Sequence, residues 1–426
     1  MSTLKYYVWL SAAEGIGAAT AVKLIRHFGT AERVFFADAG EYKKVSGITP
    51  SEMAALANKD LSHPSGILAR CTELGQRIVT IQDAEYPERL RNIYDPPLVL
   101  YVKGRLPAID EEAAIAIVGT RTCTPYGLKT AEKCGYTLAR RGLLVVTGLA
   151  KGVDSAAALG ALRGGGGVIG VLGCGIDVIY PPTNKELYED VSGVGALISE
   201  YPPGTDAAGR HFPARNRIIS GLSVGVAVIE APLRSGALIT ASRALEQGRD
   251  VFAVPGNVDS FASAGANKLL RDGAIPMTSP EDIVNEYSAL FPLKINAGKV
   301  STAPLDKKRE KKLMEKHSTS QKRLDSAAGN EYIDAERDVD GNLSETTEAD
   351  AAAAREAEAE KIAISLTGAE KAVYDALRRL ARPGEAAHID DIIASAEITA
   401  AEALGAVTML ELDGSISSLG GGFYTA

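Results

Sequence analysis

The stretch "LLVVTGLAKGVDSAAALGALRGGGGVIGVLG", residues 143–173, decides the fold class of this chain. It opens with an apolar run, continues through a glycine turn into a segment of small residues with helical period, and closes with a second apolar run, residues 168–172. Near-continuous apolar strands that alternate with helices are typical of a parallel sheet that is covered on both faces.

The same alternation extends over residues 113–291. The apolar runs expected to be strands are "IAIVG" (115–119), "LLVVTG" (143–148), "VIGVLG" (168–173), "ALISE" (196–200), "VGVAVIE" (224–230), "VFAVPG" (251–256) and "AIPMT" (274–278). Between most of them lie segments with the period of a helix. The fold class predicted is therefore α/β, with a doubly wound parallel sheet.

Composition divides the chain into four regions. Residues 1–108 have a helical pattern with Gly-Ile turns, and residues 109–292 carry the strand and helix alternation. Residues 293–360 contain a basic block, "DKKREKKLMEK", followed by an acidic half, which indicates a flexible linker. Residues 361–426 show three helical segments and a terminal hairpin, the pattern of a winged helix.

The overall charge restricts the kind of partner. A net charge of -8 and a pI near 5.4 argue against a general polycation that coats nucleic acid. A local basic groove is still possible, because the field at a surface is set by nearby charges. Four cysteines without CxxC pairing, and the lack of a signal peptide or a long apolar run, lead us to expect a reduced cytosolic protein with no membrane segment.

Basic and glycine residues follow several of the predicted strands. In a doubly wound sheet, ligands bind at the carboxyl ends of the strands. Arg121, Lys151 and Lys185 follow three strands, and Ser235-Gly236 opens a helix after a fourth. Glycine turns and helix N-termini can both bind anions, although such a glycine is more often required by the geometry of the turn.

A second basic motif stands in "HFPARNRIISGLS", residues 211–223. Residues 207–229 contain no Asp or Glu, while Arg215 and Arg217 flank Asn216. Repeated phosphates along a strand explain repeated basic positions better than one small nucleotide does. The alternative is that these arginines pair with Glu200 or Glu230 and only stabilise the fold.

Sequence signatures of catalysis are missing. Neither G-x-G-x-x-G after the first strand nor G-x-x-x-x-G-K-[ST] is present, which argues against NAD and ATP as cofactors. No Ser-His-Asp set or metal-ligand set emerges. Glu200 and Glu230 end strands and could act as general bases, but such carboxylates more often cap a turn or pair with arginine.

Seven ordered motifs resemble a known family. They are "IVGTRTCTPYG" (117–127), "TGLAKGVDSAAALGAL" (147–162), "VLGCGIDVIYPPTNKELY" (171–188), "ALISEYPPGT" (196–205), "HFPARNRIISGLS" (211–223), "VIEAPLRSGALITASRALEQGRDVFAVPGN" (228–257) and "SAGANKLLRDGA" (263–274). In this order they resemble the bacterial DNA-processing protein A family, also called DprA or Smf. The flanking regions resemble that family's N-terminal helix-hairpin-helix or SAM-like domain and its C-terminal winged helix.

The resemblance implies an extended Rossmann-like domain that binds single-stranded DNA and performs no chemistry. It also implies a homodimer through this domain, protection of incoming DNA during natural transformation, and loading of the RecA recombinase. With the strand-end glycines included, the candidate phosphate-binding residues are Gly119, Arg121, Gly148, Lys151, Lys185, Arg215, Asn216, Arg217, Ser235 and Gly236. No cofactor and no metal are expected.

The chain departs from the family pattern at two positions. Ala158 stands where the family usually has His, and Pro182 stands where it often has a basic residue, for which Lys185 would compensate. In the flanking regions, the Gly15–Gly17 turn would either hold a DNA phosphate or only join two helices. The third helix of the C-terminal region, residues 399–412, has no Lys or Arg, which favours protein contacts over duplex binding.

Two other functions remain as alternatives. The first is a Rossmann-like nucleotide phosphoribohydrolase, whose P-G-G-x-G-T-x-x-E motif corresponds to "LRSGALIT" here, with Thr240 in place of the catalytic Glu. The second is a winged-helix transcription factor, which the uncharged third helix disfavours.

Overall fold

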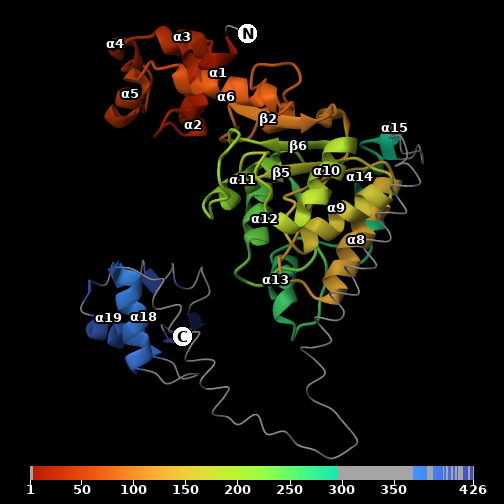
Figure 1. Ribbon diagram of the computed structural model, residues 1–426. Helices are drawn as coiled ribbons and strands as arrows, with labels where there is room; N and C mark the ends of the chain where they lie inside the picture. The colour runs from red at the N-terminus through yellow and green to blue at the C-terminus, as the bar shows by residue number, and fades with distance from the viewer. Residues whose placement is uncertain are drawn as a thin grey trace, which may run out of the picture. The chain divides into compact units, whose positions relative to one another are not determined.

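The computed structural model describes residues 3–295 continuously and residues 368–425 with gaps. The chain divides into two compact units, residues 1–322 and 323–426. Figure 1 shows the first unit as a sheet flanked by helices, with a group of helices at its N-terminal end. Nearly all of the predicted linker, residues 296–360, lies outside the described residues.

A nine-stranded sheet forms the centre of the first unit, in the order β1-β2-β6-β5-β4-β3-β7-β8-β9. All seven predicted strands are confirmed. The strands are β1 (Arg77–Thr80), β2 (Val99–Gly104), β3 (Ala114–Val118), β4 (Leu144–Thr147), β5 (Val168–Leu172), β6 (Ala196–Ser199), β7 (Gly225–Val228), β8 (Asp250–Ala253) and β9 (Ile275–Pro276). Strands β3 to β9 run parallel to their neighbours within that set. The chain winds outward from β3 to β6 and then returns to β7 on the other side of β3, as a doubly wound sheet requires.

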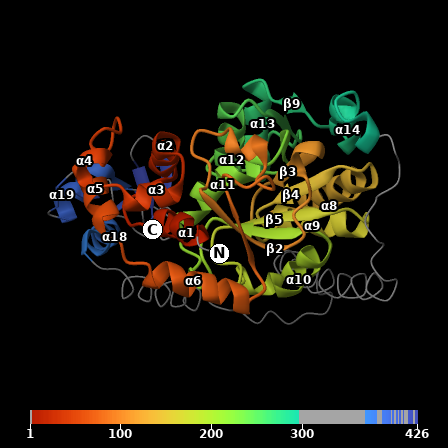
Figure 2. The same cartoon turned by 90° about the horizontal axis from the view of Figure 1, so that it is seen from above.

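Helices cover both faces of this sheet. Figure 2 shows α8, α9 and α10 on one side of the strands and α11, α12 and α13 on the other. The helices of the first unit are α1 (Leu4–Ala12), α2 (Ala18–Phe28), α3 (Ala31–Phe36), α4 (Ala39–Tyr42), α5 (Pro50–Ala57), α6 (Ser62–Glu73), α7 (Glu88–Arg91), α8 (Pro125–Arg140), α9 (Val153–Arg163), α10 (Lys185–Val194), α11 (His211–Gly221), α12 (Gly236–Glu246), α13 (Ala264–Arg271), α14 (Pro280–Ser288) and α15 (Pro292–Ile295). Short 3-10 turns precede α10 and α13, at Pro182–Asn184 and Phe261–Ser263.

Small residues let α8 and α9 pack closely against each other. A Cβ atom at Gly135 would collide with the carbonyl of Ala157, and one at Gly160 would collide with the carbonyl of Glu132. The small residues of α8 and α9 therefore serve the packing of these two helices. Strands β4 and β5, which precede and follow α9 in the chain, are fully buried. Ala158, one of the two departures from the family pattern, is completely buried in this helix.

Residues 77–104 differ from the helical pattern expected for the N-terminal region. Strand β2 pairs antiparallel with β6, with Tyr101 opposite Ser199, and β1 pairs antiparallel with β2. The sheet is therefore mixed rather than fully parallel, and its domain begins before residue 109. Without this pairing β6 would be an exposed edge, which proteins usually cover. Residues 4–73 are helical as predicted, and their apolar side chains join the same core as the sheet.

The second unit contains α18 (Gly368–Leu380), β10 (Ala387–His388), α19 (Ile389–Ala396), β11 (Ser417–Gly420) and β12 (Phe423–Thr425). Its strands form a small sheet in the order β10-β12-β11. Its core includes Val373, Leu377, Ile392 and Leu410. Residues 402, 403, 406, 407 and 410 are helical, and Ala403, Val407 and Leu410 among them belong to that core. These features agree with a winged helix.

Candidate nucleic-acid interface

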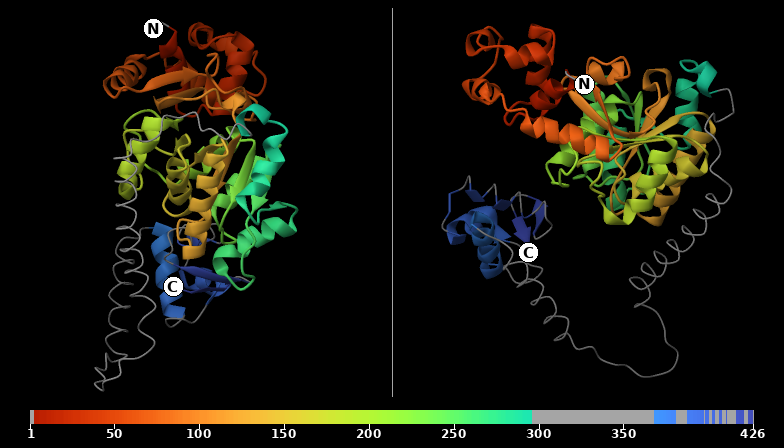
Figure 3. Two further views of the ribbon diagram at one scale, coloured as in Figure 1. Left: turned by 90° about the vertical axis from the view of Figure 1, so that its right-hand side faces the viewer. Right: turned by 45° about the horizontal axis from the view of Figure 1, so that its top comes forward.

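Three exposed cations stand on adjacent loops at the carboxyl edge of the sheet. Arg121 follows β3, Lys151 follows β4, and Lys185 begins α10 after β5. We call these three side chains the basic rim. These three strands, β3, β4 and β5, are neighbours in the sheet, so the three positions follow adjacent strands. Figure 3 gives two further views of this sheet and its flanking helices.

Close packing and hydrogen bonds join the three segments that carry the basic rim. Gly152 has a φ of +85°, and a Cβ atom there would lie 2.7 Å from the carbonyl oxygen of Arg121. On the other side, the Asn184 amide donates hydrogen bonds to the carbonyl oxygen of Leu149 and to Ser155 Oγ, both at 2.8 Å. The loop after β4 is therefore fixed between the loop that carries Arg121 and the loop that carries Lys185. Pro182, the second departure from the family pattern, is exposed on the latter.

Aromatic rings lie beside the basic rim. The Arg121 guanidinium carbon is 5.0 Å from the ring centroid of Phe212, which is a favourable cation–π geometry. Tyr180 packs on Phe212 with centroids 5.2 Å apart, and Tyr201 stacks on His211 at 4.2 Å. Neither tyrosine is among the predicted site residues. Their signal was a Tyr-Pro pair shortly after each of two strands, at 180–181 and 201–202.

Arg215 lies beneath this surface instead of on it. Its side chain is buried, with 4% of the residue exposed, and its Nη1 donates to the carbonyl oxygens of Gly148, at 3.0 Å, and Val171. Burial lowers the pKa of Arg215, and the nearby Asp154 carboxylate opposes that change. Asp154 in turn accepts from the Gly148 N–H. Arg215 therefore fixes the end of β4, and its guanidinium is not exposed as a phosphate contact would require.

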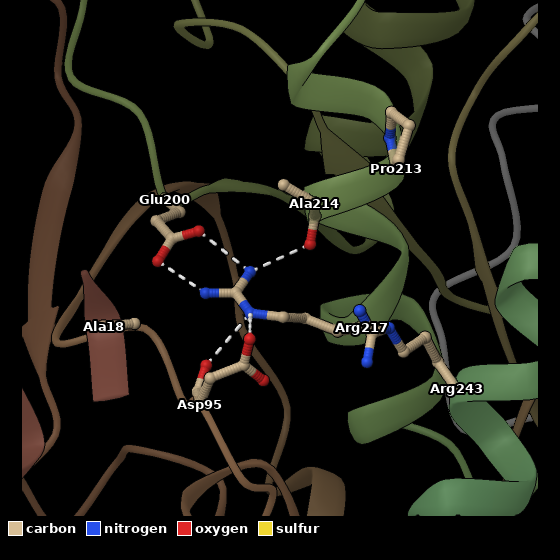
Figure 4. Close-up of a pocket in the computed structure, with 7 residues that line it drawn as sticks. All are labelled: Ala18, Asp95, Glu200, Pro213, Ala214, Arg217 and Arg243. Carbon is tan, nitrogen blue, oxygen red and sulfur yellow. Dashed lines mark hydrogen bonds and ion pairs between the residues drawn. The ribbon is translucent and has the colours of Figure 1, made fainter. Parts of the chain in front are cut away.

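Arg217 also differs from the expectation, and Figure 4 shows why. Its guanidinium makes a two-point ion pair with Glu200, at 2.9 and 2.7 Å, and its Nε donates to the carbonyl oxygen of Asp95 at 2.9 Å. The Asp95 carboxylate is 3.1 Å from the same Nε, and only 5% of Arg217 is exposed. Arg217 therefore makes the ion pair with Glu200 that the alternative hypothesis expected.

The helical period explains why the two arginines separate. Residues two apart on a helix point about 200° away from each other, so one phosphate-binding face of α11 cannot hold both. Arg215 points to the ends of β4 and β5, and Arg217 points to the loop that precedes β2. The spacing of two residues could have predicted that Arg215 and Arg217 point to opposite sides of α11. The partner Asp95 could not be predicted, because it lies in residues 1–108, for which the sequence predicts helices.

The remaining predicted residues hold the surrounding turns. A Cβ atom would meet Val153 at 2.6 Å if placed on Gly119, and the Arg215 guanidinium at 2.5 Å if placed on Gly148, so both glycines are required by packing. Ser235 caps α12 by accepting from the Ala237 N–H at 3.3 Å. Asn216 donates to the carbonyl oxygen of Gly236 at 3.1 Å, which ties α11 to the start of α12.

Both candidate general bases are engaged in structural contacts. Glu230 accepts from the backbone N–H of Thr124 at 2.9 Å and from its hydroxyl at 2.6 Å, so it caps the turn before α8. Glu200 is held by Arg217. Among the described residues there is no group of three or more His, Cys, Asp or Glu side chains that could hold a metal ion. In the same part of the chain, no helix is both long enough and apolar enough to cross a membrane.

Comparison with known proteins identifies the family. Residues 77–288 match the model of DNA recombination-mediator protein A, and residues 349–422 match that of the DprA winged helix domain. A DNA processing protein DprA from Streptococcus pneumoniae is 46% identical over 208 residues, which are 49% of this chain and 73% of the relative. The chain belongs to the DprA/Smf family.

Further DprA/Smf proteins support the same conclusion. A protein Smf from Synechocystis is 36% identical over 289 residues, which cover 67% of this chain and 73% of the relative. The crystal structure of DprA from Streptococcus pneumoniae superposes with a TM-score of 0.60 at 37% identity, over 66% of this chain and 97% of that one. The family model begins at Arg77, the first residue of β1, so the family's domain includes both antiparallel strands.

Proposed function

We propose that this chain binds single-stranded DNA along the basic rim, and that it does so without chemistry. The observation that carries the proposal is the placement of Arg121, Lys151 and Lys185, all exposed, on three adjacent loops of one sheet edge. Three separated cations on a chain of net charge -8 form a local positive site that suits a polymer with repeated phosphates.

The aromatic rings favour an unpaired strand over a duplex. Surfaces that bind single strands combine cations along the backbone with aromatic side chains on which bases stack, and a duplex does not expose its base faces. Phe212 and Tyr180 stand beside Arg121 at the rim, and Tyr180 is 39% exposed. A base of the bound strand can therefore stack where its neighbouring phosphate is held.

The proposal that the chain is not an enzyme rests on the state of its carboxylates. Glu230 and Glu200 are committed to Thr124 and Arg217, so neither is free to accept a proton from a substrate. Thr240, which stands where the phosphoribohydrolase motif has its Glu, is buried in α12. Incubation with nucleoside monophosphates tests this alternative, since release of free base would establish a hydrolase.

Membership of the family supports the wider role. We propose that the chain acts as a homodimer in the cytoplasm, where it protects single strands in recombination and natural transformation and loads RecA on them. The winged helix would then serve a protein contact or autoregulation instead of duplex binding. A mixing assay of RecA filament growth on strands covered by a single-strand binding protein tests the loading step.

The decisive experiment is a binding titration of Arg121→Ala with oligo-dT. Loss of one charge-assisted phosphate contact should weaken binding by about 1–3 kcal/mol, which is about 5- to 150-fold. Arg141→Ala is the matched control, because Arg141 is an exposed arginine that follows α8 at the opposite edge of the sheet, and it pairs with Glu281. Equal affinities for wild type and Arg121→Ala, with both folded, would refute the proposed site.

A further inference from the structure

Four large apolar side chains are exposed at the carboxyl edge, on the loops and helix start that follow β3, β7 and β8. Tyr126 is 53% exposed at the start of α8, Leu233 55% after β7, and Val258 and Phe261 85% and 79% after β8. We call this set the apolar platform. Its strands, β3, β7 and β8, are neighbours in the sheet. Exposed apolar groups that gather in one place usually mark a contact surface.

Hydrogen bonds fix the loops that carry the apolar platform. Tyr126 Oη donates to the carbonyl oxygen of Pro255 at 3.4 Å, which joins the start of α8 to the loop after β8. The side chain of Asn267 closes the same loop through two bonds to the backbone of Gly256, both at 3.1 Å. The Gly265 N–H donates to the carbonyl oxygen of Ala231 at 2.7 Å, which joins the loop after β7 to the start of α13. The platform is therefore a built surface of three joined loops.

The platform continues directly from the basic rim. Arg121 stands on the short connection between β3 and α8, and Tyr126 is the second residue of α8, so a polymer held at Arg121 can reach Tyr126 without leaving the sheet edge. The loop of residues 254–263, which carries Val258 and Phe261, contains Asp259 and no Lys or Arg, so it suits uncharged flat groups and disfavours phosphates. Leu233 stands on a different loop, where Arg234 follows it.

We propose that the apolar platform binds bases of the same single strand whose phosphates are held on the basic rim. This inference rests on the proposed function and extends it to a second subsite of different chemistry. Phe261 and Tyr126 provide ring faces for stacking, and Val258 and Leu233 provide apolar contact around them. Because every base has an aromatic face, the subsite would accept any sequence.

Two variants and two probes separate the contributions of bases and phosphates. Phe261→Ala should weaken binding of oligo-dT by about 5- to 150-fold, since stacking on one aromatic side chain is worth about 1–3 kcal/mol per base. The same variant should bind an abasic oligonucleotide of equal length as wild type does, because that probe has no bases to stack. Arg121→Ala should weaken binding of both probes. Tyr94→Ala is the control, since Tyr94 is 88% exposed outside the platform.

The outcomes distinguish this inference from the proposed function. If Phe261→Ala binds oligo-dT as tightly as wild type while Arg121→Ala loses affinity, the platform is wrong and the basic rim stands. If wild type itself does not bind oligo-dT, both fail together. If Phe261→Ala weakens both probes equally, the side chain supports the phosphate site, and base stacking is refuted.

Photocrosslinking provides a second, direct measurement. An oligo-dT that carries 5-iododeoxyuridine should crosslink to Phe261 or Tyr126, and peptide mapping of the adduct should place it within residues 125–127 or 257–263. Crosslinks confined to Phe212 and Tyr180 would overturn the proposal. Loss of a dimer by Phe261→Ala in gel filtration without DNA would also overturn it, because the platform would then be a surface between two copies of the chain.

Discussion

Three arginines with the same predicted role lie in three different environments. Arg121 is exposed on the basic rim, Arg215 supports the end of β4 from below, and Arg217 is neutralised by Glu200 and Asp95. A guanidinium can serve phosphate binding only where its N–H groups are free, and burial against carbonyl and carboxylate oxygens uses them. The residue type alone therefore does not distinguish a candidate phosphate contact from a buried arginine, whereas the burial of each guanidinium does.

The buried ion pair between Arg217 and Glu200 leads to a prediction about stability. Arg217→Met removes one partner of a buried ion pair and leaves Glu200 without its counter-charge, so the free energy of unfolding should fall by about 3–5 kcal/mol. Urea denaturation measures this loss. Arg243→Met is the matched control, because Arg243 lines the same small cavity but makes only an exposed pair with Glu246, worth less than about 1 kcal/mol.

The DNA affinity of the Arg217→Met variant provides a second test of the role of Arg217. Arg217→Met should bind oligo-dT as wild type does under conditions where it remains folded. Unchanged stability combined with a large loss of affinity would mean that Arg217 contacts phosphate after all.

At the scale of elements, the sheet is larger than the alternating pattern indicated. Strands β1 and β2 stand among helices; β1 pairs with β2, and β2 pairs with β6, which lies about a hundred residues later. Such long-range pairing leaves no periodic signal in its own segment, and the run "VLYVKG" reads equally well as part of a buried helix. By contrast, the seven parallel strands each follow the local pattern of an apolar run between turns.

Truncation tests the importance of these strands. A chain that starts at residue 109 lacks β2, so the edge of β6 is open and Arg217 loses its contact with Asp95. We expect this chain to aggregate, whereas one that starts at residue 3 should stay folded, as judged by circular dichroism and gel filtration. A monomeric, folded chain from residue 109 would show that β1 and β2 are dispensable.

At the scale of the whole molecule, an acidic protein presents a cationic edge. The net charge of -8 opposes DNA at long range, while the three cations of the basic rim attract it within about 10 Å, the screening length at ordinary salt. Association should therefore depend strongly on ionic strength, and the dependence should report how many phosphates the edge neutralises.

A salt titration tests this expectation. The logarithm of the oligo-dT association constant should fall linearly with the logarithm of salt concentration, with a slope of about -0.7 for each neutralised phosphate. Arg121→Ala should reduce the magnitude of this slope by about 0.7, and Phe261→Ala should leave it unchanged, since a base contact releases no counterions. A slope that is the same for wild type and Arg121→Ala would contradict a phosphate contact at Arg121.

The seven parallel strands, the helices between them and the loops at the strands' carboxyl ends follow from the sequence alone, because apolar periodicity and strand-end turns are local properties of the chain. The same local pattern also predicts Arg121, Lys151 and Lys185 at one edge, since the carboxyl ends of parallel strands meet there. The folded chain was needed to show that Arg215 and Arg217 are internal, that Tyr180 and Tyr201 join the edge, and that β1 and β2 complete the sheet. Each of these depends on a partner distant in sequence, and burial of a charge is a property of everything packed around it.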